Sequence, residues 1–247
     1  MIYLTNFTNH TNYNLLKDNL SNPNISVCLE ERDVHYNPYD PYNGHDYVEI
    51  GGLKWATMNV GATNITDYGL YFQWGDISGY TTSQVGSGAE QKYFGWADYK
   101  YGNGTSSPSA SMIKYNYSAN GKTVLEASDD AAQVNWGGSW RMPTKDEYVA
   151  LSTAVNTTWT TDYQGSGIAG MICIDKTDSS KVLFFPACGY CSNGSVGNVG
   201  NRGSCWSKSL NNDSSQSAYG LFFNDDRVNW QATYGRCAGF PVRGVVD

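Results

Sequence analysis

Alternating and clustered apolar positions along the chain predict many short strands. Two short apolar runs, Tyr47–Ile50 and Leu53–Trp55, flank Gly51-Gly52, and paired glycines favour a tight hairpin turn. Two further strand pairs are expected nearer the C-terminus, each separated by a polar turn. Their members are Gly170–Ile174 with Lys181–Phe185 and Tyr219–Phe223 with Arg227–Trp230, and a last strand follows at Phe240–Val245.

Two helices are predicted between these strands. The first begins at Ser128, where Asp129 and Asp130 suit the positive end of a helix dipole. The second begins at Thr144, which forms a capping box with Glu147. Its expected buried stripe consists of Tyr148, Leu151 and Val155. Few helices, many short strands and long loops indicate the α+β class.

The first 45 residues differ from the rest of the chain. They are rich in Asn and contain Pro23, Pro38 and Pro41, which predicts an irregular N-terminal segment. The pattern becomes dense from Asp46. We therefore expect an assembly or attachment segment over residues 1–45 and one ligand-binding domain over residues 46–247. Within the domain, the Gly/Ser/Thr-rich stretch Tyr80–Ala110 is expected to be a loop.

The composition of the chain argues against several classes of protein. Aromatic residues make up 14% of the chain, which argues against disorder. The net charge is −7 and Lys and Arg do not cluster, so nucleic-acid binding is disfavoured. No apolar stretch approaches the roughly 18–20 residues of a membrane span. The N-terminus lacks the basic and apolar regions of a signal peptide, so we expect synthesis in a cytosol without export.

The six cysteines do not establish a metal or redox site. Cys188 and Cys191 have the spacing of a metal-binding or redox pair, but no second pair follows. The three histidines all lie before Asp46. We predict no catalytic residue, no metal site and no cofactor.

Five motifs after Asp46 resemble the C-type-lectin-like superfamily, in its formylglycine-generating-enzyme branch. They are Trp55–Gly61 (WATMNVG), Tyr68–Asp76 (YGLYFQWGD), Asn135–Thr144 (NWGGSWRMPT) with Glu147, Asn201–Ser207 (NRGSCWS) and Gly239–Arg243 (GFPVR). The similarity is greatest to bacterial surface domains and to variable proteins of diversity-generating retroelements. It implies a C-type-lectin-like fold with two helices, several short antiparallel strands and long loops. In the N-terminal segment, Asn22–Glu30 and Asp33–Pro38 resemble tail-associated proteins of phages that infect gut bacteria.

The bulky residues of these motifs are expected to be structural. Large aromatic side chains are mostly buried, with one polar group that finds a partner. Arg141 is expected to bond backbone carbonyls or a carboxylate. The predicted core and scaffold residues are Trp55, Trp74, Trp136, Trp140, Trp206, Trp230, Phe240 and Val242.

The retroelement resemblance implies a variable region at about residues 190–243. In such proteins the adenines of Asn codons are randomised, which yields any residue except Lys, Glu, Gln, Met and Trp. Strand alternation would direct Gly220 and Phe222 outward, and Leu221 and Phe223 into the core. Twelve positions depart from the Asn-rich pattern of the family and belong to the reachable set. These predicted ligand-binding residues are Ser204, Cys205, Gly220, Phe222, Asp226, Arg227, Ala232, Thr233, Tyr234, Gly235, Cys237 and Ala238.

The resemblance implies a non-enzymatic receptor-binding protein, a phage tail-tip adhesin of the virion that binds a host-surface protein or glycan. Similarity to phage tropism determinants implies a homo-oligomer, with a trimer favoured. Three alternatives stay open. One is a bacterial cell-surface ligand-binding domain of the same fold, and another is a polar sheet edge of a structural domain. The third is a formylglycine-generating-type oxidase, in which Arg236 would lower the pKa of Cys237, although Cys237 has no cysteine partner nearby in sequence.

Overall fold

The computed structural model describes residues 42–102, 104, 112–116 and 121–247. The chain divides into units of residues 1–35 and 36–247, and every described residue belongs to the second. Most of the predicted N-terminal segment therefore lies outside the described residues. His45 stacks on Trp136 with ring centroids 4.1 Å apart, so the domain includes residues just before the expected boundary at Asp46.

The strands of the described residues form four small antiparallel sheets, in the orders β1-β2-β11, β3-β4-β5, β6-β7 and β10-β9-β8. The first two sheets comprise β1 (Tyr47–Ile50), β2 (Leu53–Asn59), β11 (Arg243–Val246), β3 (Val155–Thr160), β4 (Gly170–Asp175) and β5 (Val182–Pro186). The other two comprise β6 (Tyr190–Ser192), β7 (Ser195–Gly197), β8 (Arg202–Leu210), β9 (Ser217–Asn224) and β10 (Val228–Gly235).

The helices of the described residues are few and short. They are α3 (Ala131–Trp136), α4 (Lys145–Ala154) and the single 3-10 turns η1 (Thr82–Gln84), η2 (Trp96–Asp98), η3 (Ala127–Asp129) and η4 (Tyr163–Gly165). None of these helices is long and apolar enough to cross a membrane. Two helices with many short antiparallel strands confirm the α+β class.

The start of the first helix differs from the prediction. The segment Ala127–Asp129 forms η3, and α3 begins only at Ala131. The Asp130 carboxylate caps α3 by accepting hydrogen bonds from the backbone N–H groups of Ala132 and Gln133. An Asp side chain satisfies such free N–H groups best from the cap position, which explains why the helix starts after Asp130.

The second helix begins where the capping box predicts. The Thr144 hydroxyl accepts the Glu147 N–H at 3.2 Å, and the Glu147 carboxylate accepts the Thr144 N–H at 2.7 Å. Tyr148 and Leu151 are buried as expected. Val155 is buried too, but as the first residue of β3.

The predicted strand pairs are all present, with one shift at the C-terminal end. The Gly51-Gly52 turn joins β1 and β2, and both glycines have positive φ. The last strand, β11, begins at Arg243, whereas Phe240 makes only an isolated bridge with Phe72. Pro241 lacks the N–H that would continue a ladder from Phe240, which accounts for the later start.

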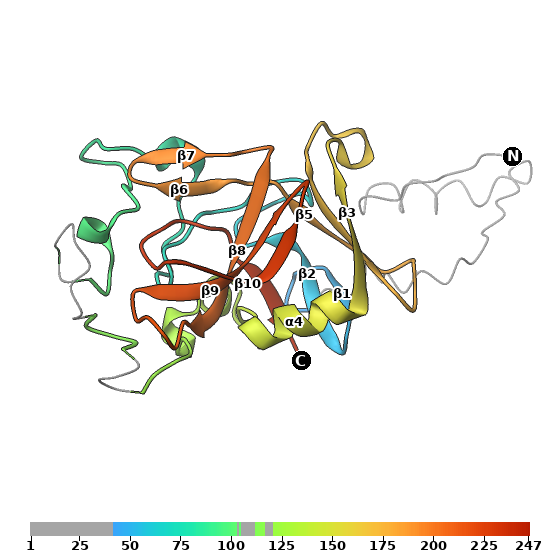
Figure 1. Ribbon diagram of the computed structural model, residues 1–247, viewed down its shortest axis with the longest axis horizontal. Helices are drawn as coiled ribbons and strands as arrows, with labels where there is room; N and C mark the ends of the chain where they lie inside the picture. Colours follow the sequence, from blue (N-terminus) through green and yellow to red (C-terminus); the bar gives the residue numbers. More distant parts are fainter. Residues whose placement is uncertain (1–41, 103, 105–111, 117–120) are drawn as a thin grey trace, which may run out of the picture. The chain divides into compact units, whose positions relative to one another are not determined.

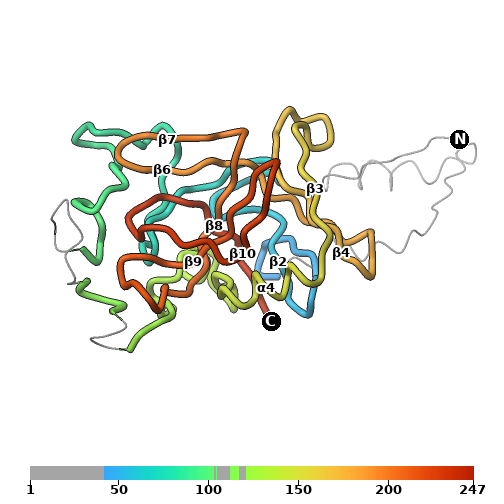
Figure 2. Tube along the Cα trace, viewed as in Figure 1, coloured from blue at the N-terminus to red at the C-terminus, as the bar shows by residue number. Residues whose placement is uncertain are grey.

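The β10-β9-β8 sheet lies between two groups of core residues. Helix α4 contacts all three of its strands and β4 contacts β8 and β9, as the ribbon shows for α4 (Figure 1). The core on this side includes Trp55, Tyr148 and Phe185. The core on the other side includes Trp74 and Phe240. Figure 2 shows β2, near the start of the described chain, among the C-terminal strands, as its pairing with β11 requires.

The structural roles predicted for the motif residues are largely confirmed. Trp55, Trp74, Trp140 and Trp206 are at most 1% exposed, whereas Trp136 is only partly buried. Arg141 donates to both oxygens of Glu147, at 2.8 and 2.7 Å, and thereby ties the segment before α4 to its first turn. Trp230 is half-buried, and Phe240 and Val242 are fully buried.

Candidate functional site

The register of the β10-β9-β8 sheet decides which predicted site residues share a face. Ser204 pairs with Phe222 and Trp206 pairs with Gly220, so these four positions lie on one face. Their neighbours in sequence lie on the other face. That opposite face packs into the core with Cys205, Leu221 and Phe223.

The opposite face confirms one prediction and contradicts another. Leu221 and Phe223 are fully buried, as strand alternation predicts. Cys205 pairs with Leu221 and is only 2% exposed, so the prediction that it belongs to an exposed surface is wrong. Its thiol occupies the same buried layer as Leu221.

The face that carries Phe222 is covered along part of its length. Trp206 packs on Phe240 with ring centroids 4.6 Å apart, and its indole N–H donates to the Phe72 carbonyl at 2.8 Å. A Cβ at Gly220 would lie 2.7 Å from the backbone oxygen of Cys205. The prediction that Gly220 is free to vary outward is therefore wrong, because the backbone of the neighbouring strand β8 lies too close to admit a side chain.

Two more predicted positions are buried on the same sheet. Ser204 is 0% exposed and Ala232, which pairs with Gly220, is 8% exposed. A direct ligand contact needs an exposed side chain, so the structure contradicts this role for both residues.

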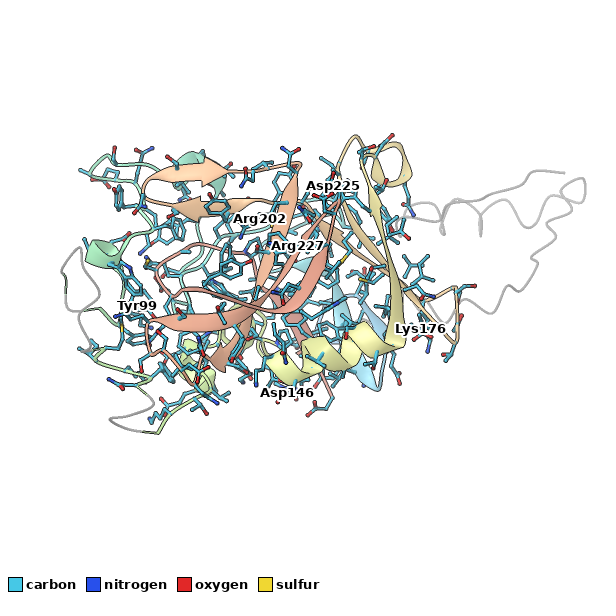
Figure 3. All side chains as sticks on the ribbon, viewed as in Figure 1. Tyr99, Asp146, Lys176, Arg202, Asp225 and Arg227 are labelled. Atoms are coloured by element: carbon cyan, nitrogen blue, oxygen red, sulfur yellow. The ribbon has the colours of Figure 1, made fainter. Side chains whose placement is uncertain are left out.

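The uncovered part of the face is a cluster of half-buried aromatic side chains around a guanidinium. The Arg202 guanidinium carbon lies 4.7 Å from the ring centroid of Tyr190, 4.9 Å from that of Phe222 and 5.3 Å from that of Tyr234. The Arg227 guanidinium carbon lies 5.2 Å from the same Phe222 ring. We call Tyr190, Arg202, Phe222, Arg227 and Tyr234 the aromatic–arginine cluster; Figure 3 labels its two arginines.

The two arginines of the cluster have no acidic partner in the part of the chain that the structure describes. Neither forms an ion pair with a carboxylate of residues 42–102, 104, 112–116 or 121–247. Arg202 makes two long hydrogen bonds, of 3.4 and 3.3 Å, to the Ser204 hydroxyl. Arg227 is exposed and its guanidinium has no hydrogen-bond partner in the described part of the chain. Most guanidinium donors of this surface are therefore available to a ligand.

Two other arginines of the domain are fixed inside the core. Arg236 is 0% exposed and donates to the Tyr99 hydroxyl at 2.7 Å and to the Ser215 carbonyl at 2.8 Å. Arg243 is equally buried and donates to the Asn59 side chain at 2.9 Å. Oxygens of the protein thus satisfy these buried guanidiniums, in contrast to those of the cluster.

A cleft of about 320 Å³ adjoins the cluster at the turn between β9 and β10. The turn is fixed by Asn224, whose side-chain oxygen accepts the Arg227 N–H at 2.9 Å and whose N–H donates to the Arg227 carbonyl at 3.0 Å. We call this hollow the turn cleft. It is lined by Thr157, Thr158, Trp159, Met171, Asn224, Asp225, Asp226, Arg227 and Val228.

The remaining predicted site residues lie along β10 and just after it. Thr233 is exposed, and Gly235, Cys237 and Ala238 are half-buried. A Cβ at Gly235 would lie 3.5 Å from the Trp96 ring, at ordinary contact distance. The structure thus brings Phe222, Asp226, Arg227 and Tyr234 to the cluster and the turn cleft.

The sequence predictions missed four residues of this surface: Tyr190, Arg202, Asp225 and Trp159. A signal existed for Arg202, because it lies two positions before Ser204 and shares its face once β8 is recognised as a strand. Tyr190 lies between Cys188 and Cys191. The spacing of these cysteines indicates a metal-binding or redox pair and gives no signal for Tyr190. Trp159 belongs to β3, a strand that the sequence pattern did not predict.

The thiols of the described residues are protonated at neutral pH. Burial raises the pKa of Cys188 to about 11 and the pKa of Cys173, Cys191 and Cys237 to about 12. The expected lowering of the Cys237 pKa by Arg236 is therefore wrong, because the Arg236 guanidinium is held in the core by other partners.

Metal-ligating side chains do not gather in the described part of the chain. No three His, Cys, Asp or Glu residues there lie together as a group that could hold a metal ion. No family model, curated protein or solved structure matches the chain.

Proposed function

We propose that the protein is a non-enzymatic ligand-binding protein whose binding surface is the aromatic–arginine cluster with the turn cleft. One observation carries the proposal: the half-buried Phe222 ring contacts two guanidiniums that form no ion pair with a carboxylate of the described residues. Aromatic and arginine side chains are the residue types that dominate binding energy in protein interfaces. Below them, the buried layer of Leu221 and Phe223 supplies a fixed support.

We also propose that the domain has a C-type-lectin-like fold and acts as a phage tail-tip adhesin in the virion, with a host-surface receptor. The five motifs support this proposal, since their large side chains form the core while the positions of the variable region include the exposed turn at Arg227. A bacterial cell-surface domain of the same fold is the second candidate. The two differ in location rather than in the chemistry of the site.

Binding of the full-length protein to candidate host cells tests the first proposal. Phe222→Ala and Arg227→Ala should each weaken binding by about tenfold, the loss expected when an anchor residue is truncated. Lys176→Ala is the matched control, because Lys176 is exposed and Figure 3 shows it well away from Arg202 and Arg227. If binding survives these changes and is lost on substitution within Tyr80–Ala110, the binding surface lies elsewhere.

The proposed adhesin would assemble as a homotrimer, to which residues 1–45 contribute. Weak contacts on each copy gain affinity when several sites are linked. Light scattering of the full-length protein at micromolar concentration measures the assembly directly. A strict monomer would contradict this part of the proposal.

The raised thiol pKa values support a binding protein over an oxidase. Oxidation at cysteine needs a thiolate, and protonated, buried thiols are poor nucleophiles. A copper-dependent oxygen-uptake assay on the full-length protein separates the two functions. Substrate-dependent oxygen uptake that is lost on Cys237→Ser would contradict the non-enzymatic proposal.

A further inference from the structure

The guanidiniums of the aromatic–arginine cluster keep N–H groups that have no acceptor in the described part of the chain. Aromatic rings interact with the face of a guanidinium through their π electrons. The N–H donors lie in the guanidinium plane and match the two oxygens of a carboxylate. Arg202 has three rings within 5.3 Å, two long bonds to Ser204 and a hydrogen bond with the Tyr234 side chain, so its position is fixed although no carboxylate of the described residues pairs with it.

A second guanidinium stands beside the first. Arg202 and Arg227 both contact the Phe222 ring, so two positive charges without an ion-pair partner among the described residues share one aromatic side chain. Another half-buried arginine of the domain has a carboxylate partner: Arg141 donates to both oxygens of Glu147 at 2.8 and 2.7 Å. The cluster has the donors of such a pair, but no described residue supplies the acid.

The turn cleft adds acceptors to these donors. Asp225 and Asp226 are exposed at its rim, next to Arg227. A ligand with several neighbouring carboxylates, such as an acidic peptide, would meet repulsion from this pair. A ligand with one carboxylate among hydroxyl groups would satisfy both arginines and aspartates, because hydroxyls donate to carboxylates. Thr157, Thr158 and Trp159 line the same cleft, and an aromatic ring beside hydroxyl-bearing residues suits a sugar ring.

We propose that this surface binds a carboxylate-bearing saccharide, with the sugar carboxylate on Arg202 and Arg227 and its hydroxyls toward Asp225 and Asp226. The proposal rests on the proposed function and names the ligand chemistry of that same surface. Arg227 joins the two halves of the site, since it contacts Phe222 and also lines the turn cleft.

Titration of the full-length protein with matched sugars tests the proposal. The probes are D-glucuronate and N-acetylneuraminate, each compared with its own methyl ester by ligand-observed NMR. The ester keeps the ring and hydroxyls but removes the charge, so any preference for the acid reports the carboxylate. We expect at least one acid to bind about tenfold more tightly than its ester, and added salt to reduce that preference.

Variants assign the preference to the two arginines. Arg227→Gln should abolish the acid–ester difference, as should Arg202→Gln, whereas Arg202→Lys should retain part of it. Lys176→Gln removes one exposed positive charge remote from the cluster and should leave the difference unchanged (Figure 3). Circular dichroism melting identifies any variant that fails to fold, and Arg227→Gln, at an exposed turn position, keeps the test decisive.

Two results would overturn the saccharide proposal. One is that neither acid binds more tightly than its ester, which includes the case in which no acid and no ester binds. The other is preferential binding of a glutamate-rich peptide that depends on Arg227. If host-cell binding still depends on Phe222 in either case, the proposed binding surface stands and only its ligand chemistry is wrong. If Phe222→Ala and Arg227→Ala leave cell binding intact, the proposed surface itself fails.

Discussion

The ring of Tyr234 lies 4.7 Å from the ring of Phe240, at an interplanar angle of 65°. Tyr234 therefore belongs to the aromatic–arginine cluster and also packs against the core, because Phe240 is only 1% exposed. The same ring contacts Trp206 at 6.2 Å. Tyr234 thus contributes to the stability of the domain as well as to the proposed binding surface.

This packing predicts that Tyr234→Ala destabilises the domain by about 2–4 kcal/mol, since it removes a half-buried aromatic ring that its neighbours cannot fully replace. Tyr234→Phe keeps the ring and should cost less than about 1 kcal/mol. Urea unfolding of the two variants provides the comparison. An unchanged unfolding midpoint for Tyr234→Ala would show that the ring contributes nothing to the fold.

Two glycines of the predicted binding set should respond differently to substitution. A Cβ at Gly220 would lie 2.7 Å from the Cys205 carbonyl oxygen, so Gly220→Ala should destabilise by about 1–3 kcal/mol through overpacking against backbone. A Cβ at Gly235 would meet the Trp96 ring at 3.5 Å, and Gly235→Ala should change stability by less than about 1 kcal/mol. Thermal melting of the pair measures this directly. Equal losses of stability at both glycines would contradict the contrast between the tight site at Gly220 and the open site at Gly235.

Local signals in the sequence predicted the elements that depend on local chemistry. The Gly51-Gly52 turn and the Thr144–Glu147 capping box each depend on residues within a few positions of one another, and both are confirmed. The strand pair that flanks Asn224 likewise depends on residues within a few positions of one another. Where a tertiary contact contributes, the pattern was insufficient: the Asp130 carboxylate that caps α3 also accepts the Met142 N–H at 3.0 Å.

The candidate site was predictable only in part, for a physical reason. Alternation assigned Leu221 and Phe223 to the core, but it carries no information about a second layer over the opposite face. Phe240 packs on Trp206 on that face, while Phe222 stays half-exposed. The cluster unites β6, β8, β9 and β10, so no single sequence window contains it.

Buried thiols predict slow chemical labelling. Cys188 and Cys191 are at most 1% exposed and burial raises their pKa to about 11 and about 12, so neither should react with iodoacetamide at pH 7 in the native protein. Cys237 is half-buried and should react slowly, as its pKa is raised to about 12. Mass spectrometry of labelled peptides, with a urea-denatured sample as control, identifies each site. Rapid native labelling of Cys188 or Cys191 would reopen the oxidase alternative.

Asp129 predicts how the fold responds to acid. It is 4% exposed, so burial alone would raise the pKa of its carboxyl. Hydrogen bonds from Lys114, Tyr101 and Tyr115 outweigh burial and hold that pKa well below its usual range. Because the folded-state pKa is lowered, the contribution to stability is present above the unfolded-state pKa of about 3.9 and is lost as the pH falls below it.

Replacing this carboxylate should therefore change both the stability and its pH dependence. Asp129→Asn should destabilise the domain by roughly 1–3 kcal/mol at pH 7, since Lys114 and the Tyr115 hydroxyl lose a charged acceptor. It should also flatten the fall in unfolding free energy between about pH 5 and pH 2, because the group that takes up the proton is gone. Asp213→Asn, at an exposed turn, is the control and should leave the curve unchanged. Urea unfolding at several pH values measures both effects, and parallel curves for Asp129→Asn and the parent protein would refute the role assigned to this carboxylate.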